Sequence, residues 1–277
     1  MATLSGRPVA VLLVLLFLGS LFPFQSSGAT YLDEGRGGGS DNVEITWQGA
    51  PAPGNAMDVD VSGDYVFIAA SSGLLIVNIS NADELSETAF IDLPGAIGAV
   101  TVAGSYACVA AGEQGLHMVD ISDPEYPALV GNYDSPGFTE DVVVAGSYAY
   151  VADGSEGLRV VDISDPYSPQ EIGVYRTGTS YVESVAVSGN YAYLADSLRG
   201  FRIVDISDNT RPKKTGDLDV AGTSDGIDVS GDWVYIADGE GGLRIITVED
   251  KETPYQVHTY VTPGYAHAVV ATADRAY

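Results

Sequence analysis

The chain has 277 residues, of which 38 are acidic and 12 are basic, and its formal net charge is −26. This charge argues against nucleic-acid binding, because nucleic-acid phosphates would be repelled rather than neutralised. The only cysteine, Cys108, excludes an intrachain disulfide, so the fold must depend on its apolar core.

The N-terminus has the pattern of an export signal. Arg7 precedes an apolar run over residues 9–22, and small residues at 26–29 suit cleavage, so we expect residues 1–29 to be a signal peptide. A retained membrane anchor is the alternative, although the run is shorter than the roughly 20 residues of a spanning helix. The mature protein is therefore predicted to be secreted or displayed at the cell surface, with no further membrane span.

Residues 30–42 contain a glycine-rich stretch and are predicted to be a flexible linker. Residues 43–48 then resemble the strand that ends each later repeat. The chain thus begins one strand out of phase, as expected of a ring in which an N-terminal strand completes the last repeat.

The unit at 141–184 shows the organisation of the rest. Its apolar runs are rich in β-branched and aromatic residues and are separated by Gly, Asp, Ser and Pro, which favours short antiparallel strands. We name the four predicted strands A to D in chain order; they cover residues 142–144, 148–152, 158–163 and 171–175.

The glycine between strands A and B recurs at intervals of 41 to 43 residues. It stands at Gly63, Gly104, Gly146, Gly189 and Gly231, with Ala273 in the sixth slot. Four strands in about 40 residues are typical of one propeller blade. The sequence therefore predicts an all-β propeller over residues 43–277 with about six four-stranded antiparallel blades, the sixth incomplete; the ring is closed imperfectly or the sequence is a fragment.

The third strand of these units carries a recurring motif at 116–120 (LHMVD), 158–162 (LRVVD) and 201–205 (FRIVD). At these residues the chain resembles the LVIVD-repeat family, although Asn78 and Thr247 replace the motif's aspartate in units 1 and 5. The resemblance implies a propeller of a secreted or surface protein and leaves its activity open.

Apolar side chains that alternate along strand A are predicted to pack between blades. They are Val142, Val144, Val185, Val187, Ile227 and Val229. Tyrosines of strand B, such as Tyr148 and Tyr150, are interpreted as filling between sheets, with sugar stacking by one or two of them as the alternative.

Acidic residues recur at two positions counted from the hairpin glycine. Six residues before it stand Glu140, Glu183 and Asp225, and seven after it stand Asp153, Asp196 and Asp238, with His267 in the next slot. Loops before strand A and after strand B emerge on one face, so these side chains are expected to gather there. We expect this acidic half-face to bind calcium, held by Glu140, Glu183 and Asp225, or a cationic partner. The alternative is that the second set merely begins Asp-Gly-type turns.

Other motifs have structural interpretations. Residues 222–226 fit G-x-S-x-G, but no helix follows the serine, as that motif requires. Residues 58–63 begin like a calcium loop, yet Ala69 stands where a glutamate is needed. Asp120, Asp162 and Asp205 are expected to cap turns.

The leading functional hypothesis is a non-enzymatic propeller that binds an extracellular protein or glycan, with calcium as the only candidate cofactor. The alternative is an extracellular hydrolase or lyase that uses axial carboxylates as acid and base. A third is a structural spacer.

Overall fold

The computed structural model describes residues 28–32, 42–46, 54–81, 85–197, 199–220, 222–273 and 275–277. The described residues form strands and turns, and they contain no helix long and apolar enough to cross a membrane. The predicted signal peptide lies outside them except for its last two residues, which begin a strand.

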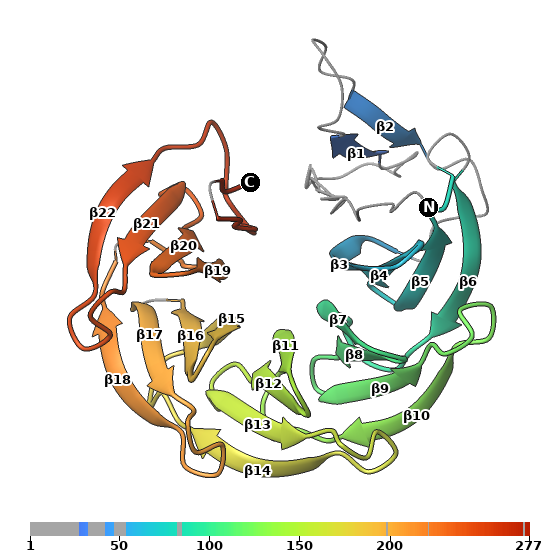
Figure 1. The fold of residues 1–277 in the computed structure, drawn as a ribbon, viewed down its shortest axis with the longest axis horizontal. Coiled ribbons are helices and arrows are strands. Elements are labelled where there is room, and N and C mark those ends of the chain that lie inside the picture. Colours follow the sequence, from blue (N-terminus) through green and yellow to red (C-terminus); the bar gives the residue numbers. More distant parts are fainter. Residues whose placement is uncertain are drawn as a thin grey trace, which may run out of the picture.

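Five four-stranded antiparallel sheets follow one another around a common centre (Figure 1). Blade 1 contains β3 (Ala56–Ser62), β4 (Tyr65–Ala70), β5 (Gly73–Asn78) and β6 (Ser86–Asp92). Blade 2 contains β7 (Ala99–Ala103), β8 (Tyr106–Ala110), β9 (Leu116–Asp120) and β10 (Ala128–Tyr133). Blade 3 contains β11 (Asp141–Ala145), β12 (Tyr148–Ala152), β13 (Leu158–Asp162) and β14 (Gln170–Tyr175). Blade 4 contains β15 (Val182–Ser188), β16 (Tyr191–Asp196), β17 (Gly200–Asp205) and β18 (Lys213–Leu218). Blade 5 contains β19 (Gly226–Ser230), β20 (Trp233–Ala237), β21 (Leu243–Thr247) and β22 (Tyr255–Tyr260).

The strand assignments agree with the sequence pattern to within about one residue in blade 3. All five hairpin glycines have a positive φ, between 58° and 63°, which a β-branched side chain would adopt only with strain. Strand A lies innermost and strand D outermost (Figure 1).

The expectation of about six blades needs correction, since the described residues form five. Residues 267–271, expected as a sixth strand A, are not in a strand and make one isolated bridge, from Ala271 to Ala276. The segment still follows the inner wall, because the Ala271 amide donates to Asp228 Oδ2 at 2.7 Å. Its end pairs only with residues 275–277, through backbone hydrogen bonds between Val270 and Tyr277, and this short pairing does not extend into a sheet.

The N-terminal strand also differs from expectation. β2 (Asn42–Thr46) pairs with β1 (Gly28–Leu32) in a separate two-stranded sheet, and not with a strand of the C-terminal repeat. Residues 30–32 of the predicted linker are therefore extended and paired, whereas residues 33–41 lie outside the described residues.

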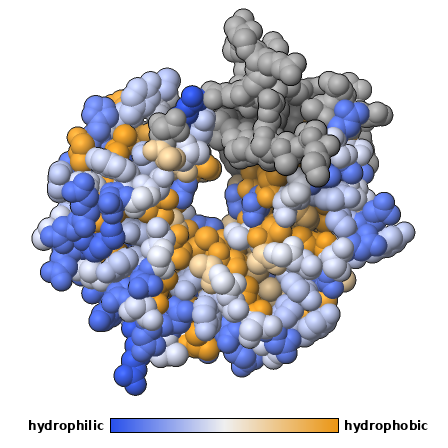
Figure 2. All heavy atoms as spheres, viewed as in Figure 1, coloured by the Kyte–Doolittle hydropathy of each residue, from blue (hydrophilic) through white to orange (hydrophobic). Residues whose placement is uncertain are grey.

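The core consists of four apolar clusters, one at each joint between successive blades. The alternation predicted for strand A is confirmed: Val142, Val185 and Ile227 are buried, and their partners two residues on pack against the same clusters. Cys108 is also buried, which raises its pKa to about 12 and fits a filling role. Figure 2 shows hydrophobic residues gathered towards the centre and hydrophilic ones over the periphery.

Carboxylates join the innermost strands of neighbouring blades. Asp58 and Asp60 of blade 1 accept hydrogen bonds from the amides of Val100 and Val102, at 2.9 and 2.7 Å. Asp141 of blade 3 accepts the Val185 amide in the same way, at 2.9 Å. These side chains satisfy donors on the inward edge of the next blade.

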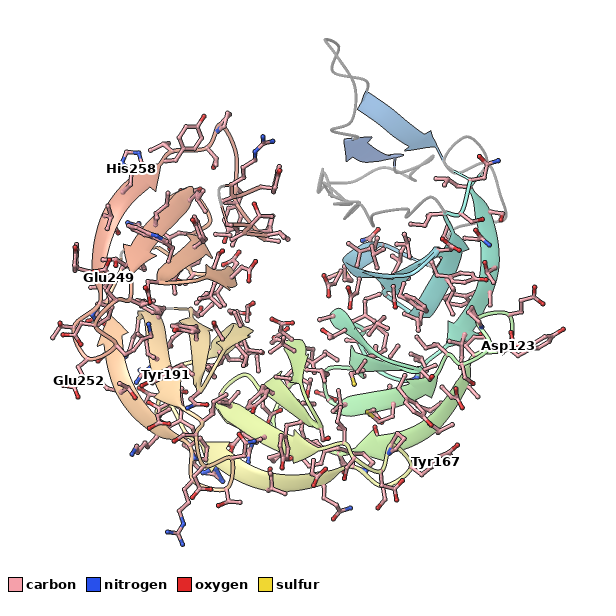
Figure 3. All side chains as sticks on the ribbon, in the orientation of Figure 1. Asp123, Tyr167, Tyr191, Glu249, Glu252 and His258 are labelled. Atoms are coloured by element: carbon pink, nitrogen blue, oxygen red, sulfur yellow. The ribbon has the colours of Figure 1, made fainter. Side chains whose placement is uncertain are left out.

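The C-to-D turn of each blade packs against strand D of the blade before it. A glycine occupies the contact point in blades 2, 3 and 4, at Gly131, Gly173 and Gly216; an added Cβ there would lie 2.0–2.1 Å from a carbonyl oxygen of the neighbouring turn. The register shift in each C-to-D pair lies beside this position. In blade 5 the equivalent residue is His258, which lies on the outer strand (Figure 3).

Candidate functional site

The structure brings the predicted mouth residues together at one end of the inner wall. Glu140, Glu183 and Asp225 each precede or begin strand A of consecutive blades, and Glu183 is in electrostatic contact with both of the others. His267 follows, with its Nδ1 3.6 Å from Asp225 Oδ2 and its ring 4.5 Å from the Tyr265 ring. We call Glu140, Glu183 and Asp225 the acidic mouth.

Burial and like charge alter the mouth's protonation. Burial raises the pKa of Glu183 to about 7, and the charges of Glu140 and Asp225 add to the shift. Burial also raises the pKa of Glu140, against a hydrogen bond donated by the Tyr181 hydroxyl. Crowded carboxylates of this kind favour a bound proton or cation.

The mouth is nevertheless not arranged as a metal centre. Among the described residues, no group of three or more His, Cys, Asp or Glu side chains is placed to hold a metal ion. The calcium site at Glu140, Glu183 and Asp225 therefore stays a prediction without support from this geometry.

The second acidic set lies elsewhere. Asp153, Asp196 and Asp238 are fully buried, so they do not extend the acidic face. Each forms an ion pair with the arginine six residues later in strand C; the arginines are Arg159, Arg202 and Arg244. Buried carboxylates need such partners, because an unpaired charge would be strongly destabilising.

The Asp153 pair is the centre of the fullest network. The carboxylate accepts Ser135 Oγ at 2.6 Å, the Gly137 amide at 3.1 Å and Arg159 Nε at 3.0 Å. Arg159 also contacts Glu156 and Glu171, at 2.9 and 3.2 Å. The pair thus ties the loop before strand A to strands C and D of the same blade.

Asp196 lacks one of these partners. Its Oδ1 is buried and has no hydrogen-bond partner. In blades 3 and 5, the residue that precedes the acidic-mouth residue has a hydroxyl that donates to the buried aspartate; these residues are Thr139 and Ser224. In blade 4 the same position is Val182, which has no donor. Blade 4 also lacks the donor that Ser135 supplies in blade 3, because the equivalent Thr177 donates to the Ser180 carbonyl instead, and together these two differences leave the oxygen without a partner.

A signal for the ion pairs was present in the sequence. The second residue of the strand C motif is arginine only in those blades in which the seventh residue after the hairpin glycine is aspartate. Blade 1 has Ala70 and Leu75 in the two slots, and blade 2 has Ala111 and His117, whose Nε2 lies 2.8 Å from the Pro94 carbonyl. Recognising this covariation would have placed the second set inside the blades.

The remaining motifs have the structural roles expected of them. Asp120, Asp162 and Asp205 accept the amide two residues on, at 2.9 Å, and these hydrogen bonds and those of the adjacent serine hydroxyls lower their pKa values. Ser224 of the G-x-S-x-G match is buried and donates to Asp238, so it is no exposed nucleophile.

Three solved structures resemble this chain at low sequence identity, and one of them is named as a β-propeller domain. A functionally unknown protein from Desulfotomaculum acetoxidans DSM 771 is 14% identical, with a TM-score of 0.67 over 85% of this chain and 77% of that one. The Cps50 (Swd1) β-propeller domain of Myceliophteria thermophila is 12% identical, with a TM-score of 0.63 over 78% and 75%. The computationally designed Ika8 protein is 9% identical, with a TM-score of 0.64 over 92% and 78%. These likenesses concern the fold alone.

No curated protein matches the sequence at a significant level. A family model for the LVIVD repeat matches five times, at residues 53–89, 94–135, 136–177, 180–220 and 221–262. The matches follow the five blades and together include most of the chain. The protein therefore belongs to the LVIVD-repeat family.

Proposed function

We propose that this protein is an exported, non-enzymatic propeller that binds an extracellular protein or glycan through its acidic mouth. The observation that carries the proposal is the row formed by Glu140, Glu183 and Asp225, three carboxylates from successive blades in which the charge of Glu183 interacts with those of the other two. Turn chemistry does not account for these residues, and their mutual repulsion is relieved when a cationic group binds.

Three further features support this proposal. The pattern over residues 1–29 is that of an export signal, so the partner would be met outside the cell. The net charge of −26 would attract basic partners over a long range. Tyr181 and Tyr265 stand beside the carboxylates and add aromatic surface to the mouth.

The test compares two charge-matched triple variants. Glu140→Gln/Glu183→Gln/Asp225→Asn neutralises the mouth, whereas Asp134→Asn/Glu249→Gln/Glu252→Gln neutralises exposed peripheral residues, of which the last two are labelled in Figure 3. Binding to glycan and basic-peptide arrays, with and without calcium, should weaken at least tenfold in the first variant only. Equal loss in both variants would show a general charge effect, and no loss in either would refute the mouth as the site.

One observation favours the hydrolase or lyase as a second candidate. A pKa of about 7 at Glu183, beside the carboxylates of Glu140 and Asp225, is the arrangement of a general acid with a charged neighbour. Turnover of chromogenic glycosides or uronate polymers that is lost in Glu183→Gln would establish it. Specific binding without turnover would support the binding module.

A further inference from the structure

The end of strand C in blade 1 differs from the other blades in a way that has a chemical consequence. Blades 2, 3 and 4 end this strand with Asp-Ile-Ser, whereas blade 1 ends it with Asn78-Ile79-Ser80. Of the chain's asparagines, only Asn78 has a serine or threonine two residues after it. Asn-x-Ser without a central proline is the acceptor pattern for an N-linked glycan. Because this tripeptide often occurs by chance, the structure around it decides whether it is an acceptor.

The side chain of Asn78 is held in one orientation by the serine of the same tripeptide. Its Oδ1 accepts hydrogen bonds from the Ser80 amide at 2.8 Å and from Ser80 Oγ at 2.6 Å. Since both of these groups donate, the amide oxygen faces Ser80 and Nδ2 is turned away from it. The nitrogen that would carry a sugar is therefore not used to hold the turn.

Blade 4 shows where the second atom of this side chain points. Asp205 accepts the Ser207 amide through Oδ1, while its Oδ2 lies 3.5 Å from Nζ of Lys213, a side chain that is 74% exposed. The residue paired with Asp205 on strand D is Lys213, and the residue paired with Asn78 is the smaller Ser86. The Nδ2 position of blade 1 thus faces solvent, with a short side chain beside it.

The surface around Asn78 has room for a sugar. Asn78, Ser86 and Glu87 line a solvent-open groove of about 350 Å³, and Ser80 is exposed. Tyr126 lies along the same groove and is 77% exposed, so its ring offers an apolar face to a sugar placed there.

We propose that Asn78 is the acceptor of an N-linked glycan. In this reaction Nδ2 bonds to the anomeric carbon of a sugar held on a polyprenyl pyrophosphate, and the bond from that carbon to the phosphate oxygen breaks. The pyrophosphate leaves with the electron pair, and a base of the oligosaccharyltransferase takes the amide proton. Because such transferases act outside the cytoplasm, the inference rests on the export that is part of the proposed function.

The glycan would divide the two ends of the ring between different roles. Asn78 pairs with Tyr65, the first residue after the A-to-B hairpin, so it lies at the end of the blade opposite to the acidic mouth. A glycan there covers the groove and leaves the mouth open to a partner.

The experiment separates export from modification by secreting the chain from yeast in two forms. One form keeps its own residues 1–29, and the other has a yeast secretion signal before residue 30. Peptide-N-glycosidase F in heavy-oxygen water converts a glycosylated asparagine to a heavy aspartate, which peptide mass spectrometry locates. We expect the label at residue 78 in the second form, and its complete loss in Asn78→Asp, which restores the residue of the other blades, and in Ser80→Ala.

The matched control is Asp205→Asn, which creates the same Asn-Ile-Ser tripeptide at the equivalent position of blade 4. Secreted second form without a glycan at Asn78 would overturn the inference. A glycan at residue 205 of the control alone would place the fault in blade 1, and a glycan at neither position would show that this turn is no acceptor in any blade. Retention of the first form in the cell would contradict the export signal, while the second form still decides the glycan.

Discussion

The buried pair of Asp153 and Arg159 can be tested with a replacement that the protein already contains. Blade 1 carries Ala70 and Leu75 in the two slots, so Asp153→Ala/Arg159→Leu converts the blade 3 pair into the blade 1 pair. Both native side chains are almost wholly inaccessible, at 0% and 2% exposure. The comparison therefore measures a desolvated ion pair against an apolar pair in a framework that accepts both.

The single changes should be unequal. Arg159→Leu leaves Asp153 charged and buried with only the neutral donors Ser135, Thr139 and the Gly137 amide, so we expect a loss of about 3–5 kcal/mol in the free energy of unfolding. Asp153→Ala leaves Arg159 with Glu156 and Glu171, so about 1–2 kcal/mol is expected.

The double variant should recover most of the larger loss and fall within about 1 kcal/mol of the native protein. Urea unfolding followed by circular dichroism gives the four free energies of the cycle, and melting temperatures should follow with shifts of roughly 2–4 °C per kcal/mol. A double variant as unstable as Arg159→Leu alone would refute the argument, since it would show that the charge pair itself is required.

The remaining predictions concern single positions. Val182→Thr should give Asp196 Oδ1 a donor and raise stability by about 1 kcal/mol, measured by urea unfolding; a loss would show that the apolar packing of Val182 matters more. Because burial raises the pKa of Glu183 from 4.5 to about 7, its contribution to stability is fully present below pH 4.5 and is lost as the pH rises through 7. The melting temperature should therefore fall between pH 5 and pH 8. Glu183→Gln should remove on the order of 1 kcal/mol of the stability lost over this pH range, and an unchanged pH dependence would contradict the pKa shift. Gly146→Val should cost about 1–2 kcal/mol in thermal unfolding through backbone strain alone, because nothing lies within 4 Å of its added Cβ; an unshifted melt would disprove the need for a positive φ.

The blade architecture was predictable because its signals are local. The hairpin glycine fixes the A-to-B turn, and β-branched residues on either side fix which faces are buried, as at Val142 and Val185. The predicted first strand of a sixth blade was wrong for a non-local reason. The segment at 267–271 has a strand's composition, but among the described residues it pairs only with the short run at 275–277, and two such short segments do not form a stable sheet.

The candidate site was only half predictable. Glu140, Glu183 and Asp225 meet because the repeat places equivalent positions side by side, which spacing alone can show. Asp153 lies just as near in the sequence but points inward, because Arg159 neutralises it within the blade. Counting carboxylates without counting their basic partners gave a face twice as acidic as the real one.

His258 limits how the blades of this protein can be rearranged. Blades 2, 3 and 4 share a glycine at the position where the following turn rests, so each could stand in another's place without losing that contact. Blade 5 could not be moved into the middle of the series, because its imidazole would occupy the space that a carbonyl such as that of Asn209 takes. Copies of this gene made by shuffling repeats would thus be constrained in order, and a designer who wished to lengthen the array internally would duplicate blade 3 or 4 and leave blade 5 where it is.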